Sequence, residues 1–173
     1  MSEETWRRLS NRLKGTVTNL QSNHPERYFY KKLKTFLPKG DSNFDGIIKF
    51  LVDESNGDIS EKVGLTASSN QDYCKNVTQY NTNSDYQSKN EPNGWICFDF
   101  KDKRIIPTNY QIKSCNYDPS TYQPKSWIIE GLNDNGEWEN LSTVNDCSYL
   151  NGKCLSHIFP VTNPNQKKFR SIR

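Results

Sequence analysis

Hydrophobic residues follow two different periodicities along the chain, and the first is helical. Over the first twenty residues, apolar side chains recur at every third or fourth position: Trp6, Leu9, Leu13, Val17 and Leu20. This spacing places them on one stripe of a helix. A second apolar set follows Pro25 at helical spacing and ends before Gly40: Phe29, Leu33, Phe36 and Leu37. We therefore expect a helical arm or linker over residues 1–40.

From Val63 onward the apolar residues occur in short runs that alternate with polar ones, as in β-strands with one covered face. The clearest run is Trp95–Phe100, in which Ile96, Phe98 and Phe100 share a face. Further strands are expected at residues 63–67, 105–113, 126–132, 138–141, 156–161 and 169–173. The polar residues 70–93 contain too few aliphatic side chains for a core strand, so we expect a loop with one short turn near Asn76.

Turn residues separate these predicted strands. The dipeptides Asn135-Gly136 and Asn151-Gly152 can both adopt positive φ, which favours tight hairpins. Short strands at close spacing, with no long helices between them, indicate antiparallel pairing in a sandwich or a barrel. The sequence therefore predicts a mostly β protein: a compact domain over residues 44–173, preceded by the helical arm.

Charge is distributed unevenly between these two parts. Residues 1–40 hold nine Lys and Arg against three Asp and Glu, whereas residues 41–173 hold fourteen against seventeen. The arm is therefore basic and the domain mildly acidic, and we expect no nucleic-acid partner. The arm has two interpretations: it packs on the domain or a neighbouring chain, or it meets a partner helix or an anionic surface.

Membrane and secretion signals do not stand out in the sequence. No run approaches the roughly 18 apolar residues of a membrane helix, and the N-terminus lacks the apolar core of a signal peptide. The five cysteines are an odd number and cannot all pair. We expect a cytoplasmic protein whose thiols are reduced.

Several motifs occur in a recognisable order: Thr66-Ala67-Ser68-Ser69, Trp95–Phe100, Pro124–Gly131 running into Asn133–Trp138, and Phe169–Arg173. Together they resemble the discoidin family, the coagulation factor five/eight type C domain, which is a galactose-binding-like jelly roll. The resemblance covers residues 44–173 and implies an antiparallel β-sandwich. The segment Phe44–Leu51 is similar to the lead-in of an intracellular branch, in which the domain often accompanies protein-interaction domains such as BTB.

The chain departs from this family in two ways. Family members continue beyond the last motif with a final strand, whereas this sequence stops at Arg173. We therefore expect the sandwich to lack its last strand, which would expose a sheet edge unless the arm completes it. Secreted members also commonly tie their ends with a disulfide, and no cysteines stand at the corresponding ends.

The resemblance implies a binding surface in the loops at one end of the sandwich, matched by residues 70–90, 116–123 and 145–150. Candidate ligand-binding residues there combine flat rings or amides with polar groups: Tyr73, Tyr86, Asn90, Tyr117, Tyr122 and Tyr149. The structural core is expected to include Trp95, Phe98, Phe100, Trp127, Ile129 and Trp138. The three tryptophans in that set have an alternative interpretation, stacking on a sugar ring.

Metal and catalytic sites are less well supported by the sequence. Asp72, Asp85 and Asp118 could contribute oxygen ligands to calcium, without the spacing of a known calcium loop. Cys147, Cys154 and His157 are close in sequence, but their spacing matches no usual zinc pattern. No nucleophile elbow, phosphate loop or metalloprotease motif occurs. We therefore predict a non-enzymatic binding module without a required cofactor or metal, which acts as a protein-interaction or adaptor domain or, alternatively, binds carbohydrate.

Overall fold

The computed structural model describes residues 34–37, 39–40, 44–80, 84–117 and 122–173. The chain divides into two units, Met1–Thr35 and Phe36–Arg173, and the fold belongs to the second. Most of the predicted helical arm lies outside the described residues. Residues 34–37, its described part at the end of the second apolar set, are not helical.

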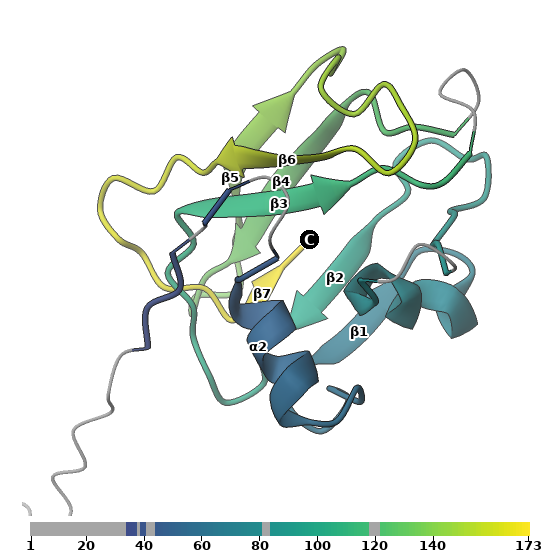
Figure 1. Ribbon diagram of the computed structural model, residues 1–173. Helices are drawn as coiled ribbons and strands as arrows, with labels where there is room; N and C mark the ends of the chain where they lie inside the picture. The colour runs from purple at the N-terminus through teal and green to yellow at the C-terminus, as the bar shows by residue number, and fades with distance from the viewer. Residues whose placement is uncertain (1–33, 38, 41–43, 81–83, 118–121) are drawn as a thin grey trace, which may run out of the picture. The chain divides into compact units, whose positions relative to one another are not determined.

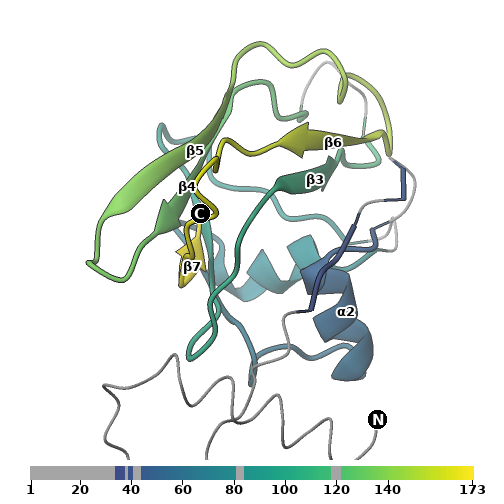
Figure 2. The same cartoon turned by 90° about the vertical axis from the view of Figure 1, so that its left-hand side faces the viewer.

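The second unit is an antiparallel β-sandwich, as the sequence predicts (Figure 1). One sheet has the strand order β1-β2-β7-β4-β5, and the other consists of β3 and β6. The strands are β1 (Gly64–Ala67), β2 (Ile96–Asp99), β3 (Asn109–Lys113), β4 (Trp127–Leu132), β5 (Trp138–Val144), β6 (Ser156–Pro160) and β7 (Ser171–Ile172). Figure 2 shows β3 and β6 on one side of the molecule, with β4, β5 and β7 on the other.

The short strand β7 lies in the middle of the five-stranded sheet. Ile172 is paired with Phe98 of β2 on one side and with Gly131 of β4 on the other. Just before β7, Phe169 forms an isolated bridge with Ile105. The chain's last residues therefore join the two halves of the larger sheet.

The described residues contain two buried apolar clusters. The first comprises Leu51, Ile59, Val63 and Phe100. It lies between helix α2 (Ile47–Glu54), which contributes Leu51, and the larger sheet. The second comprises Cys147, Leu150 and Phe159, with Tyr110, Ile112, Trp127 and Val144 packed against it. Because its members come from both sheets and from the β5–β6 connection, the second cluster holds the layers together.

The polar run after β1 contains a helix, so the expected loop with one short turn is wrong there. Residues Gln71–Thr78 form the 3₁₀ helix η2. Its first side chain lies along the edge of β1: Gln71 Oε1 accepts from Ala67 N at 2.7 Å, and Gln71 Nε2 donates to Leu65 O at 2.9 Å. A side-chain amide thus supplies the hydrogen bonds that another strand would make.

The hairpin expected at Asn151-Gly152 is also wrong, because β5 and β6 belong to different sheets. The positive φ values of this connection occur at Asp146 and Cys154 instead. The turn at residues 133–136 is confirmed, since Gly136 has φ of 83° and Asn133 Oδ1 accepts from two later backbone N–H groups.

Of the six expected core residues, Phe100 is buried, and Phe98 and Trp127 are half-buried against the two clusters. Ile129 is also half-buried. The expectation is wrong for Trp95, which is 41% exposed because it precedes β2 on the face opposite Phe98. Trp138 is half-buried beneath Arg173, whose guanidinium lies 4.1 Å from the ring centroid.

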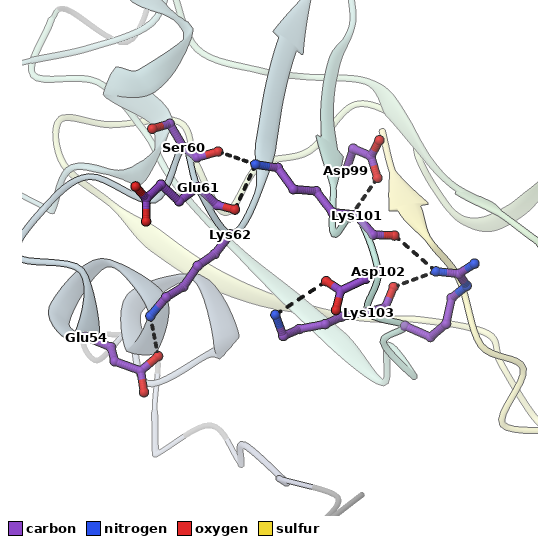
Figure 3. A network of polar contacts seen from close by, with 9 residues as sticks. Glu54, Ser60, Glu61, Lys62, Asp99, Lys101, Asp102 and Lys103 are labelled. Carbon is purple, nitrogen blue, oxygen red and sulfur yellow. Dashed lines mark hydrogen bonds and ion pairs between the residues drawn. The ribbon is translucent and has the colours of Figure 1, made fainter.

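A polar network fastens the β2–β3 turn to the segment before β1 (Figure 3). Lys101 has φ of 56°, and its Nζ donates to Ser60 O at 2.5 Å and to Glu61 O at 2.8 Å. Arg104 donates to Lys101 O and forms an ion pair with Asp134 of the β4–β5 turn. These contacts link three connections at the same end of the sandwich.

Tyr80 should make stability decrease at high pH. Its ring packs on Phe44 at 5.4 Å, and burial and the Asp53 carboxylate raise the pKa of Tyr80. The unfolded chain therefore releases this proton first, above about pH 10, and the free energy of unfolding should fall from there as pH rises. Urea titrations between about pH 8 and pH 11 should show a shallower fall in Tyr80→Phe, and parallel curves would contradict this.

Candidate ligand-binding site

Three connections meet at one end of the sandwich because of the strand directions. Antiparallel pairing of β1 with β2, and of β4 with both β5 and β7, brings the end of β1, the start of β2, the start of β4 and the end of β5 together. The connections at residues 68–95, 114–126 and 145–155 therefore leave the sheets at that end, on the right and upper side of Figure 1. We call it the loop end.

Ser114 connects two of these loops. Its N–H donates to Leu155 O at 2.7 Å, and its hydroxyl accepts from Leu155 N at 2.8 Å and donates to Gly152 O at 2.6 Å. The side chain is buried, so these bonds are shielded from water. Cys147 N also donates to Lys125 O at 2.7 Å. Hydrogen bonds therefore join the loops at residues 114–126 and 145–155 to each other at two places.

Tyr149 presents an exposed ring that is supported from below. The ring stacks on His157 with 4.0 Å between centroids and an interplanar angle of 6°, yet the residue is 64% exposed. His157 in turn meets the edge of the buried Phe159 at 4.8 Å. A column of rings thus runs from the core to the surface, which fixes the plane of Tyr149.

Tyr117 and Tyr122 form a second aromatic group in the neighbouring loop. Their rings are 5.8 Å apart in an edge-to-face arrangement, and they are 59% and 55% exposed. Gln123 Nε2 donates to Tyr117 O and to Cys115 Sγ, each at 3.4 Å. Gln123 Oε1 is buried, and the structure gives it no hydrogen-bond partner.

The remaining candidates lie in the β1–β2 connection. Tyr73 is 63% exposed on η2, and Asn90 is exposed. Tyr86 is half-buried, and its hydroxyl donates to Ser69 O at 2.8 Å. This hydrogen bond joins two parts of the β1–β2 connection that are far apart in sequence. Ligand binding by all six predicted residues stays a prediction.

From the sequence, His157 was considered only for a zinc site that its spacing did not support, so its contact with Tyr149 was missed. The sequence did contain a signal for this contact. In a strand over Ser156–Pro160, His157 and Phe159 are two residues apart and therefore lie on the same face.

No group of three or more His, Cys, Asp or Glu in the described part of the chain could hold a metal ion. Asp72 and Asp85 are both exposed, and Asp118 lies outside the described residues. Cys147 is buried in the second apolar cluster, whereas Cys154 and His157 are half-buried. Among the described residues, no helix is long and apolar enough to cross a membrane.

A depression of about 290 Å³ lies at the other end of the sandwich. It is lined by Pro107, Thr108, Val161, Thr162, Asn163 and Pro164. These residues flank the start of β3 and the end of β6, so the depression is separate from the tyrosines of the loop end.

Comparison with known proteins gives limited likeness. No family model matches the chain, and no curated protein matches it in sequence. A two-domain protein of unknown function from Bacteroides fragilis is similar at a TM-score of 0.49 and 10% identity, over 65% of this chain and 35% of that one. CpGH89CBM32-6 from Clostridium perfringens is similar at a TM-score of 0.48 and 20% identity, over 65% of this chain and 80% of that one. Neither likeness assigns a ligand to this chain.

Proposed function

We propose that the domain is a non-enzymatic binding module that recognises carbohydrate through the loop end. The observation that carries this proposal is the supported ring of Tyr149. The C–H face of a pyranose is apolar and packs on an aromatic ring, while its hydroxyls need hydrogen bonds at the rim. A ring already fixed by His157 loses little conformational freedom when a sugar covers it.

The surroundings of Tyr149 supply polar groups of the required kind. Exposed polar side chains flank the tyrosines of the loop end in sequence: Ser148 and Asn151 next to Tyr149, and Asn116 next to Tyr117. Specific small-ligand sites use few such groups next to apolar surface. The discoidin-like order of motifs in the sequence supports the same location, since that family binds through these loops.

Tyr149→Ala should weaken glycan binding at least about tenfold, which corresponds to about 1.4 kcal/mol. Tyr149→Phe should retain binding because it keeps the ring on His157. The experiment is a glycan array with the full chain, followed by calorimetric titration of the best glycan against both variants. The absence of saturable glycan binding by the unmodified chain, or equal affinity in Tyr149→Ala, would refute the proposal.

A protein partner is the second candidate, and the pair Tyr117 and Tyr122 favours it. Exposed tyrosines are enriched at protein interfaces, where they contribute a large share of the binding energy. An adaptor role inside the cell would fit this reading. Its test is a pull-down with the full chain in which the untagged chain competes for the partner. A partner retained unchanged by the double variant Tyr117→Ala, Tyr122→Ala would argue against it.

A further inference from the structure

Two cysteines lie opposite each other where β3 and β6 reach the loop end. The register of these strands pairs Lys113 with Ser156. Beyond this pair the regular ladder ends, but two backbone hydrogen bonds still join the two segments: Ser114 N donates to Leu155 O at 2.7 Å, and Cys154 N donates to Cys115 O at 3.0 Å. The backbones of Cys115 and Cys154 are therefore adjacent just beyond the ends of β3 and β6.

A disulfide spans Cα atoms about 4.4–6.8 Å apart, a separation typical of residues whose backbones are joined by a hydrogen bond. To form it, the Sγ atom of Cys115 has to leave its contact with Gln123 Nε2, which donates to it at 3.4 Å. Both residues are free thiols in the structure, and both are partly exposed, which leaves them open to a soluble oxidant.

The backbone at Cys154 supports a role for this side chain. Its φ is 54°, in the left-handed region that Gly, Asn and Asp tolerate best. Gly152 and Asn151 stand just before it in the same connection, yet a cysteine occupies the unfavourable position. Such outliers persist where surrounding contacts fix them, here the bonds of Cys154 N and Leu155 N to residues 115 and 114.

We propose that Cys115 and Cys154 are a thiol pair that forms a disulfide in the presence of glutathione disulfide. One thiolate attacks a sulfur of glutathione disulfide, forming a mixed disulfide and releasing one glutathione thiolate. The second cysteine thiolate then displaces the other glutathione. In total, two cysteine thiols are oxidised and one glutathione disulfide is reduced to two glutathione molecules.

This disulfide joins the loop that holds Tyr117 to the loop that holds Tyr149. It closes a loop of about 40 residues, which removes conformational freedom mainly from the unfolded chain. The other described cysteines are poorer reactants. Cys74 and Cys147 are buried, and burial and the Asp99 carboxylate raise the pKa of Cys97. The proposal concerns a modification site and does not depend on which ligand the loop end binds.

The test is oxidation of the full chain with glutathione disulfide, blocking of remaining thiols with N-ethylmaleimide, and peptide mass mapping. The expected product contains one peptide pair joined through Cys115 and Cys154, with a loss of about 2 Da for the two hydrogen atoms removed. Cys115→Ser should leave glutathione attached at Cys154, and Cys154→Ser should leave it at Cys115. The matched control Cys97→Ser should form the same linkage as the unmodified chain.

Thermal unfolding gives a second readout. Oxidation should raise the melting temperature of the unmodified chain and of Cys97→Ser by several degrees, and it should not raise that of Cys115→Ser. Glutathione attached separately to Cys115 and Cys154 without a linked peptide would overturn the proposal. Linkage of Cys154 to Cys147 instead of Cys115 would overturn it equally.

Discussion

Replacing Phe169 with alanine is expected to lower the free energy of unfolding by about 3–5 kcal/mol. Phe169 is fully buried, and its backbone exchanges two hydrogen bonds with Ile105, at 2.9 and 3.0 Å. Its ring lies against the backbone of Gly131 in β4. The alanine variant therefore leaves a cavity where the segment before β7 joins the larger sheet. Urea unfolding followed by tryptophan fluorescence would measure the loss.

The matched control for this prediction is Tyr73→Ala. It also removes an aromatic ring, but Tyr73 is 63% exposed on η2. Its loss should change the free energy of unfolding by no more than about 0.5 kcal/mol. Equal destabilisation of the two variants would show that the ring of Phe169 is not part of the core. The placement of β7 would then be incorrect.

The strands could be predicted from the sequence because each has one covered face. In β2, the alternation of Ile96 and Phe98 with polar residues was sufficient to predict the strand, but not which of its faces is covered. Strand pairing could not be predicted in the same way. Ser171 and Ile172 form a strand of two residues that is stable only between β2 and β4, and both partners are far away in sequence.

The helix η2 was missed for a related reason. Residues 71–78 have few aliphatic side chains, so no apolar period indicates a helix. What holds the helix is the pair of hydrogen bonds between Gln71 and the edge of β1, together with the buried Cys74 and Thr78. Contacts of this kind depend on the sheet already being in place.

The candidate site could be located from the sequence only in part. Tyr149 could be proposed because it is an aromatic residue in a polar loop. Its contact with His157 could not be predicted, because it depends on how the β5–β6 connection folds back over β6. The same limit applies to Trp95. Alternation placed it on the face opposite Phe98, but it did not show that Trp95 is exposed there. Which side chains of the loops lie together depends on the sandwich as a whole.

Gly131→Val is expected to destabilise the domain by about 3 kcal/mol through overpacking. Gly131 is buried in β4, and a Cβ atom there would lie 2.5 Å from Phe169 Cδ1 and 2.9 Å from Leu141 Cδ1. Valine favours strands, so the expected loss of stability comes from steric overlap with Phe169 and Leu141 and not from strand propensity. The control is Gly64→Val in β1, where a Cβ atom meets only Asp99, at 3.6 Å from its Cβ atom. That change should alter stability by less than about 1 kcal/mol.

A double-mutant cycle separates overpacking from a general intolerance of β4. Without the ring of Phe169, the nearest obstacle to a valine side chain at position 131 is gone, so the valine should partly fill the cavity left by Phe169→Ala. The double variant Gly131→Val, Phe169→Ala should therefore be more stable than the sum of the single losses predicts, by about 1–3 kcal/mol. Additive losses in urea unfolding would show that the two positions do not share this space. The close packing of β4 against the segment before β7 would then be incorrect.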